Sequence, residues 1–247
     1  MTVGASSGHS LPLVSLCTVT RNRAAYLPML QRLILLQTYP RERLEWVILD
    51  DSDPGQPRFQ PDHGQGLAIC YHALSKPLPL GRKRNLSHTF CRGEIIVYLD
   101  DDDYYPRTRV SHAVEELLAS PALIAGSSIL PVFFLPEREL WLAGPYGQWH
   151  ATANTFAFKR QLLDITRYDD GATQAEEKSF LQGYTLPMVQ LDHRLTIVCI
   201  GHDHNTFEKR RLKAAGINPC FRRVSSFRTD QIDVLLKIAA AYEPLTS

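Results

Sequence analysis

Two groups of aspartates follow directly after apolar, β-branched segments of the chain. Asp50 and Asp51 follow the segment LEWVIL, and the run from Asp100 to Asp103 follows EIIVYL. Segments of this composition are typical of buried strands, and in an open parallel sheet ligands bind at the carboxyl ends of strands. Clustered carboxylate oxygens suit a hard cation such as Mn²⁺ or Mg²⁺, which would in turn hold a diphosphate. A solvated acidic turn is the alternative explanation.

A basic segment lies between these two acidic groups. Gly81 precedes Arg82, Lys83 and Arg84 at the expected start of a helix. Backbone amides at a helix N-terminus and guanidinium groups both suit phosphate oxygens. A solvated positive face is the better explanation of this segment taken alone. Together with the aspartates, however, it favours a site for a sugar nucleotide.

The hydrophobic pattern predicts alternating strands and helices in the first half of the chain. Strands are expected over 13–20, 44–50, 67–72 and 94–99, and helices over 25–37, 81–90 and 106–119. In the second half, strands are expected near 129–134, 154–158 and 195–200, and helices near 175–182 and 229–242. This order is typical of an α/β sandwich with a mostly parallel central sheet. We expect a flexible leader over residues 1–11 and a single domain over 12–247.

Composition and charge narrow the class of protein. Of the 247 residues, 44% are hydrophobic and 21% are charged, which is typical of a soluble globular protein and excludes wholesale disorder. Lys and Arg total 27 against 26 Asp and Glu, so we expect no nucleic-acid partner. The five cysteines are scattered and form no CxxC pair, which favours a reducing compartment and a cytoplasmic location.

One uncharged stretch, 117–136, is long enough to span a bilayer, but Pro121, Pro131 and Pro136 interrupt it. We therefore expect a helix end, a loop and a buried strand there. The N-terminus lacks the basic region and apolar core of a signal peptide. The sequence thus predicts a chain without a transmembrane segment, for which peripheral contact with a membrane stays open.

Three ordered blocks in roughly the first 110 residues resemble glycosyltransferases of the GT-A fold, in particular the inverting family 2. VSLCTVTRNRAAYL is similar to that family's VSVIIPTYNRxxxL, WVILDDSD to VVDDGS, and GRKRNLSHTFCRGEIIVYLDDDDYYP to GxxxARNxGxxxAxGxxIxFLDxDDxxxP. Val19 stands where the family often has proline, and Asp53 and Gly55 replace the usual Gly-Ser. The resemblance implies a GT-A fold, a nucleotide-sugar-binding half over 12–110 and an acceptor-binding half over 111–247.

The resemblance also implies roles for individual residues. Thr20 and Asp51, together with Asp50, would contact the nucleobase, normally uracil. Asp100 and Asp102 match the D-x-D carboxylates of the family, so Asp102 would bind Mn²⁺ or Mg²⁺ and Asp100 would lie over the ribose or the sugar. Charged residues expected to make further contacts with the nucleotide sugar are Arg21, Arg23, Arg84, Asp101 and Lys209.

Inverting transfer needs a carboxylate on the acceptor side, which takes the proton of the attacking hydroxyl group. The family often has an E-D pair at the start of a helix, and Glu176-Glu177 fills that place in this sequence. Glu177 is expected to be the base, with Glu176 as its competitor. An acidic first turn that only stabilises the helix dipole is the alternative explanation.

Histidines and aromatic residues of the second half complete the expected site. Some GT-A enzymes complete their metal shell with a late histidine, and His202 suits that role, with His204 as its rival. A polar turn is the alternative explanation, and a zinc site of these two with His193 lacks a convincing fourth ligand. Trp149 and His150 are expected to contact the sugar or the acceptor, because aromatic faces stack on sugar rings.

The sequence therefore predicts a metal-dependent inverting glycosyltransferase that moves a hexose from a nucleotide-diphosphate sugar, normally a UDP-sugar, to a hydroxyl acceptor. Three alternatives stay open at this point. A sugar-phosphate nucleotidyltransferase would share a related core, but it normally carries a glycine-rich loop where this chain has TRNRAAY. A non-catalytic module that binds sugar nucleotides or glycans could lack a base, and a zinc hydrolase would use the late histidines.

Overall fold

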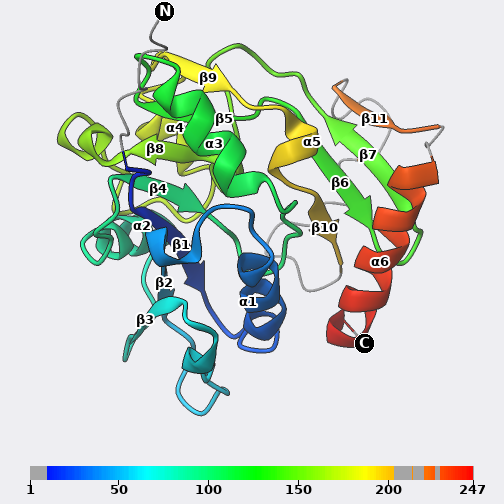
Figure 1. The fold of residues 1–247 in the computed structure, drawn as a ribbon, viewed down its shortest axis with the longest axis horizontal. Helices are drawn as coiled ribbons and strands as arrows, with labels where there is room; N and C mark the ends of the chain where they lie inside the picture. Colours follow the sequence, from blue (N-terminus) through cyan, green and yellow to red (C-terminus); the bar gives the residue numbers. More distant parts are fainter. Residues whose placement is uncertain (1–9, 203–212, 214–219, 226–228, 247) are drawn as a thin grey trace, which may run out of the picture.

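The structure is a computed structural model that describes residues 10–202, 213, 220–225 and 229–246. A seven-stranded sheet forms its centre, in the order β3-β2-β1-β4-β8-β5-β9 (Figure 1). These strands are β1 (Val14–Thr20), β2 (Leu44–Asp50), β3 (Ala68–Ala73), β4 (Ile95–Tyr98), β5 (Ile124–Gly126), β8 (Ala157–Lys159) and β9 (Met188–Gln190). Strands β3, β2, β1 and β4 are parallel, and β8 is antiparallel to both of its neighbours. The predicted α/β class with a mostly parallel central sheet is confirmed.

Helices cover both faces of this sheet. On one face, α1 (Leu27–Leu35) and α3 (Arg109–Leu118) pack against alternate strand residues such as Leu16, Trp46 and Val97. On the other face, α2 (Leu80–His88) and α4 (Glu177–Phe180) lie over the remaining strand residues, which include Cys17 and Tyr98. Strands β1, β2 and β4 therefore bury both of their faces, which explains why their sequences are largely apolar rather than alternating, whereas the edge strand β3 is only partly buried.

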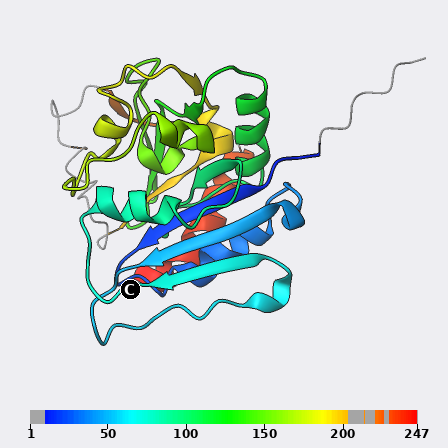
Figure 2. The same ribbon diagram turned by 90° about the vertical axis from the view of Figure 1, so that its left-hand side faces the viewer.

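Parallel pairing brings the carboxyl ends of three strands to one edge. Thr20, the last residue of β1, pairs with Asp50, the last residue of β2. Strand β4 also runs parallel to β1, so the run Asp100 to Asp103 leaves the sheet at the same edge. Figure 2 shows β1, β2 and β3 side by side, pointing in one direction. The sheet thus brings together polar residues that are widely separated in sequence.

A second sheet, of four strands in the order β10-β6-β7-β11, extends the fold. Its strands are β6 (Leu130–Phe134), β7 (Glu139–Ala143), β10 (Cys199–Gly201) and β11 (Phe221–Arg223). The last helix, α6 (Thr229–Thr246), lies beside this sheet in Figure 1. Its Ile238 and Tyr242 are buried in a cluster with Phe133 and Ile200, so α6 docks onto the protein's own core.

Some predicted elements differ from the observed ones for local reasons. The strand expected near 195–200 begins only at Cys199, because Asp192 caps the short helix α5 (His193–Thr196) through a hydrogen bond from the Arg194 amide. The helix expected near 175–182 shortens to α4, since Ala175 and Gln182 both have left-handed backbone conformations. The strand near 154–158 begins at Ala157 after a 3-10 turn.

The uncharged stretch 117–136 contains the end of α3, strand β5 and all of β6, which confirms the predicted helix end, loop and buried strand and adds one strand. Within the part of the chain that the structure describes, none of the helices has both the length and the hydropathy to cross a bilayer. All five cysteines are free thiols. The expected leader, 1–11, lies mostly outside the described residues.

Candidate functional site

A cavity of about 470 Å³ opens at the carboxyl edge of the central sheet. Nine residues predicted for the site line it: Thr20, Arg21, Arg23, Arg84, Asp100, Asp101, Asp102, Glu176 and Glu177. The loop before α2 adds apolar side chains, and the turn around Asn154 closes another side. Strand ends, the first turn of α2 and the segment before α4 thus meet around one space, as expected for ligand binding in an open α/β sheet.

The acidic run after β4 forms one wall of this cavity. Thr20 donates a hydrogen bond to Asp101 (Oγ1 to Oδ2, 2.5 Å). The guanidinium group of Arg23 donates to Asp101 at 3.1 Å and to Asp102 at 2.7 Å. Burial raises the pKa of Asp100 to about 7 and that of Asp101 to about 6, and the neighbouring carboxylates contribute to both shifts. The wall is therefore a place where added positive charge would stabilise the ionised carboxylates.

His202 reaches this wall from the second sheet. Its Nε2 lies 3.2 Å from Oδ2 of Asp102, and its ring stacks on Tyr26 with centroids 5.4 Å apart. His202 directly follows β10, whose position is fixed by parallel pairing with β6. The two residues predicted to bind the metal are thus adjacent, although 100 positions separate them in the chain.

The carboxylate oxygen suits Mn²⁺ or Mg²⁺, and the imidazole nitrogen beside it favours the transition metal Mn²⁺ over Mg²⁺, which prefers oxygen ligands. Within the described ranges, no group of three or more His, Cys, Asp or Glu side chains is arranged to hold a metal ion. A cation between Asp102 and His202 would therefore take its remaining ligands from water and from a bound substrate. Magnesium commonly binds in this way, through one or two carboxylates and substrate phosphates.

Arg84 and the two glutamates form the opposite side of the cavity. Arg84 is buried, stacks over the ring of Tyr98 at 4.7 Å and donates from Nε to Oε1 of Glu176 at 2.8 Å. Its other nitrogen lies 3.6 Å from Asp100. Glu177 is half-buried, and burial raises its pKa above the usual value, with a further contribution from Glu176. One glutamate is thus paired with Arg84, whereas the other has the raised proton affinity that suits a base.

The segment that carries these glutamates has an unusual backbone. Ala175, Gln182 and Tyr184 all have positive φ angles, between 50° and 64°, which side chains other than glycine rarely adopt. They flank α4 on both sides. Such conformations cost free energy and cluster at functional sites. Their position around Glu176 and Glu177 therefore supports a functional role for this segment.

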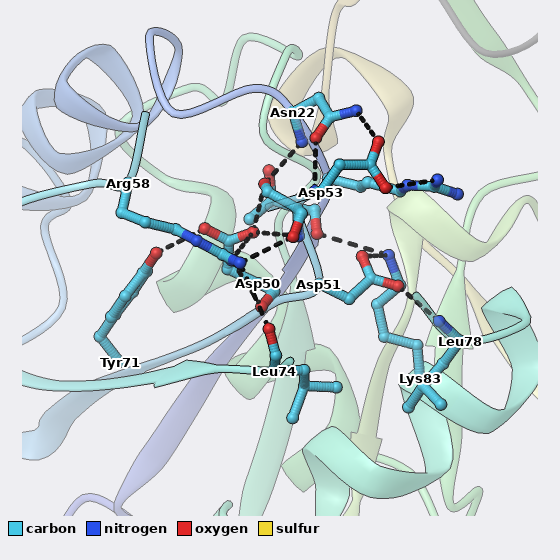
Figure 3. Close-up of polar contacts among 12 residues, drawn as sticks. Asn22, Asp50, Asp51, Asp53, Arg58, Tyr71, Leu74, Leu78 and Lys83 are labelled. Carbon is cyan, nitrogen blue, oxygen red and sulfur yellow. Dashed lines mark hydrogen bonds and ion pairs between the residues drawn. The ribbon is translucent and has the colours of Figure 1, made fainter. Parts of the chain in front are cut away.

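Asp50 and Asp51, at the carboxyl end of β2, do not line the cavity. Asp50 is fully buried, accepts hydrogen bonds from Ser52 and Tyr71, and forms a 2.8 Å ion pair with Arg58 (Figure 3). Burial opposes its ionisation, but these hydrogen bonds hold the pKa of Asp50 below the usual value. The predicted contact of the two carboxylates with a nucleobase stays a prediction.

Asp51 is also fully buried, and both of its oxygens have partners. One accepts from the ammonium group of Lys83 and the other from the backbone amide of Leu78 at 2.8 Å (Figure 3). Lys83 itself lines the cavity. Lys83 belongs to the basic segment described above, for which no separate role of Lys83 was predicted. The sequence feature that could have indicated its place in the site is its position in the first turn of α2, next to Arg84.

Asp103 and Asn154 are two further residues whose place the sequence did not predict. Asp103 accepts from the backbone amide of Ile200 at 3.0 Å and from the side chain of Asn154 at 2.9 Å. Its carbonyl oxygen accepts from the hydroxyl group of Tyr242 at 2.7 Å. Asp103 thereby joins the acidic run to β10 and α6, while Asn154 also lines the cavity.

The remaining predicted residues lie elsewhere or cannot be placed. The ring of His150 stacks on Tyr184 with centroids 4.6 Å apart and packs at a tilt against Tyr146 with centroids 4.8 Å apart, and Trp149 is 39% exposed. Neither lines the cavity, so their contact with sugar or acceptor stays a prediction. Lys209 and His204 lie outside the described residues, as does the zinc site that would need His204.

The sequence matches the profile of Glycosyl transferase family 2 over residues 15–180, which is more than half of the chain. The match includes the strand ends, the acidic run and both glutamates. The chain therefore belongs to glycosyl transferase family 2 and is a glycosyltransferase, and its sheet is that of the GT-A fold. This finding confirms the predicted family, fold and enzyme class. It favours a glycosyltransferase over the nucleotidyltransferase, the binding module and the zinc hydrolase.

Solved structures with the same fold are only distantly similar in sequence. A mannosyltransferase from Pyrobaculum calidifontis, PcManGT, in complex with GDP-Man and Mn²⁺, has a TM-score of 0.59 and 17% identity, with 94% of this chain and 70% of that chain covered. S. aureus TarS 1-349 has a TM-score of 0.58 and 15% identity, and this chain spans 60% of it. TarS 1-349 in complex with UDP-GlcNAc aligns with 14% identity over 92% of this chain and 65% of that chain. No match was found among curated protein sequences.

Proposed function

We propose that this glycosyltransferase moves a hexose from a UDP-sugar to a hydroxyl acceptor, with inversion at the anomeric carbon and in the presence of Mn²⁺ or Mg²⁺. One observation carries the proposal: a single cavity is bordered by the acidic run on one side and by Arg84 and Glu177 on the other. A diphosphate leaving group needs positive charge near it, and an attacking hydroxyl group needs a base. The cavity offers residues for both tasks.

Asp102 and His202 would hold the cation, with diphosphate oxygens and water as its further ligands. When bound, the cation neutralises charge that develops on the leaving oxygen. Arg23 donates hydrogen bonds to both Asp101 and Asp102, so it orients these two carboxylates. Arg84, held between Glu176 and Asp100, adds a fixed positive charge on the other side of the cavity.

Glu177 would act as the general base. Its carboxylate takes the proton of the acceptor hydroxyl group while that oxygen bonds to the anomeric carbon and the bond to the diphosphate breaks. Attack opposite the leaving group inverts the anomeric centre. Glu176 is the weaker candidate, because its carboxylate is already engaged by Arg84.

The donor is proposed from the family resemblance, which normally implies uracil, and from the complexes of TarS with UDP and with UDP-GlcNAc. PcManGT was solved with GDP-Man and Mn²⁺, so GDP-sugars are the comparison in the test. We further propose that residues 12–110 bind the donor and 111–247 the acceptor. The aromatic group around His150 adjoins α4, since Tyr184 both stacks on His150 and interacts electrostatically with Glu177. An acceptor next to Glu177 would therefore meet aromatic faces.

Thermal-shift measurements with UDP and GDP, each with and without Mn²⁺, test the donor and the metal together. We expect stabilisation by UDP that depends on Mn²⁺, followed by slow release of sugar from a UDP-hexose in the same buffer. The anomeric configuration of a transferred sugar, measured by NMR, tests inversion. Stabilisation by GDP alone, or metal-independent stabilisation by UDP, would contradict the proposed donor or the proposed metal.

A further inference from the structure

The wall of the cavity next to the ends of β1 and β2 presents an ammonium group rather than a carboxylate. Lys83 lines the cavity from the first turn of α2, although only 6% of the residue is exposed. Its Nζ donates to Oδ1 of Asp51 and lies 3.4 Å from the carbonyl oxygen of Thr20. An ammonium group has three N–H donors. With two directed at these acceptors, one donor remains for a molecule in the cavity.

Asp51, in contrast, is enclosed. Its side chain is fully buried, its two oxygens accept from Lys83 and from the Leu78 amide, and it does not line the cavity (Figure 3). Freeing it would break a buried ion pair and leave a charge without its partner, which is strongly unfavourable. A ligand would have to supply that free energy before it could donate a hydrogen bond to Asp51.

The chain beside Lys83 suits a flat, aromatic ligand. Leu78, Pro79 and Leu80 line the same cavity immediately before it in the sequence. Their apolar surfaces can pack against the face of a base, while Lys83 reaches the edge of that base. Pro79, the N-cap residue of α2, has no amide hydrogen and therefore presents an apolar surface without a backbone donor.

On the basis of the proposed UDP-sugar donor, we infer that Lys83, held in place by Asp51, recognises the nucleobase by donating a hydrogen bond to a ring carbonyl oxygen. This assignment reverses the role that the family resemblance implies for Asp51. A carboxylate would accept from the N3–H group of uracil, which cytosine lacks. An ammonium donor needs only an acceptor, and both uracil and cytosine carry the O2 carbonyl. The two models therefore predict different selectivity between UDP and CDP.

Isothermal titration calorimetry of UDP and CDP against the unmodified protein, with Mn²⁺ present, tests the inference without any substitution. We expect the dissociation constants to differ by less than tenfold. If CDP binds at least tenfold more weakly than UDP, the protein recognises the N3–H group of uracil, and the inference is overturned. If neither nucleotide binds, the UDP-sugar donor of the proposed function fails as well, and this outcome is distinct from a UDP-selective one.

A paired substitution tests Lys83 directly. Asp51→Asn combined with Lys83→Met removes both members of the buried ion pair, so neither charge is left without a partner. We expect this variant to bind UDP and CDP at least tenfold more weakly. Lys76→Met is the matched control, because Lys76 is exposed in the loop before α2 and does not line the cavity. Unchanged UDP binding by a paired variant that melts cooperatively would overturn the inference. If the paired variant does not fold, the comparison of UDP with CDP on the unmodified protein still tests the role of Lys83.

Discussion

Nε of Arg84 donates a hydrogen bond to Oε1 of Glu176 at 2.8 Å, and both side chains are buried. This contact joins α2, which follows the first three strands, to the segment that begins α4. It therefore fixes the distance between the two halves of the cavity. It also gives two adjacent glutamates different environments, because Glu176 accepts a hydrogen bond from Arg84 whereas Glu177 does not.

Substitution of each glutamate by glutamine should separate these roles. Glu177→Gln is expected to lower kcat by about 100-fold or more, because general-base catalysis contributes on that order, and to leave donor binding unchanged. Glu176→Gln removes the charge that compensates buried Arg84, so we expect it to lower the free energy of unfolding by about 3 kcal/mol. Steady-state kinetics and chemical denaturation measure the two effects. Near-normal turnover by Glu177→Gln would refute the assignment of the base.

The pH dependence of kcat follows from the raised pKa of Glu177. Its carboxylate must be unprotonated to accept a proton, so activity should be present above its pKa and fall as the pH is lowered through it. Because burial raises this pKa, the fall should begin at a higher pH than a solvated glutamate would give. Asp100 and Asp101 also titrate in the cavity, so the profile is compared with that of Glu177→Gln, which retains both aspartates. An acidic limb of the same shape in both proteins would exclude Glu177 as its source.

Removal of either predicted metal ligand should abolish the effect of Mn²⁺. Asp102→Ala and His202→Ala are expected to lose the metal-dependent thermal stabilisation by UDP and at least about 100-fold in kcat, because each removes one of two ligand side chains. Asp164→Ala and His63→Ala are matched controls, since both residues are exposed and lie outside the cavity. Manganese titration followed by thermal shift measures the loss. Stabilisation that persists in Asp102→Ala would place the metal elsewhere.

Docking of α6 onto the core predicts a contrast within one helix. Ile238 is 2% exposed, whereas Leu236 is 51% exposed. Ile238→Ala should lower the free energy of unfolding by about 2–4 kcal/mol through loss of buried surface and formation of a cavity. Leu236→Ala should change it by about 0.5 kcal/mol or less. Equal effects, measured by urea denaturation, would show that α6 is not packed as the structure describes.

Sequence reasoning predicted most of the first half because its signals are local and repeated. Strands β1, β2 and β4 are buried on both faces, so their apolar runs are unbroken, and each leads into polar residues at the carboxyl edge of the sheet. The second half was harder. Strands β5 and β9 are three residues long and carry too little periodicity to be recognised, and β8 and β10, equally short, were predicted with shifted starts. Strand β7, which is five residues long and only partly buried, was not predicted.

The site, too, was only partly predicted from the sequence. The resemblance predicted that Asp102 and His202 would lie together, but it did not predict that Asp51 would be enclosed by Lys83 and Leu78. The pairing of Asp51 with Lys83 depends on how α2 approaches the end of β2. That approach is set by long-range packing, which includes the hydrogen bond from the Gly81 amide to the carbonyl of Ala172. No pattern within either segment reports it.

The bonds of Asp103 affect how inactive variants should be interpreted. Asp103 is the last residue of the acidic run, but its contacts are structural. Its side chain accepts a hydrogen bond from the Ile200 amide, two residues before His202, and its carbonyl oxygen accepts one from the hydroxyl group of Tyr242. Replacing it would weaken the contacts that hold His202 beside Asp102. Loss of activity in an Asp103 variant would therefore indicate that the supporting structure has moved. Activity restored by Asp103→Asn, which keeps the shape of the side chain, would distinguish this structural effect from loss of a reacting carboxylate.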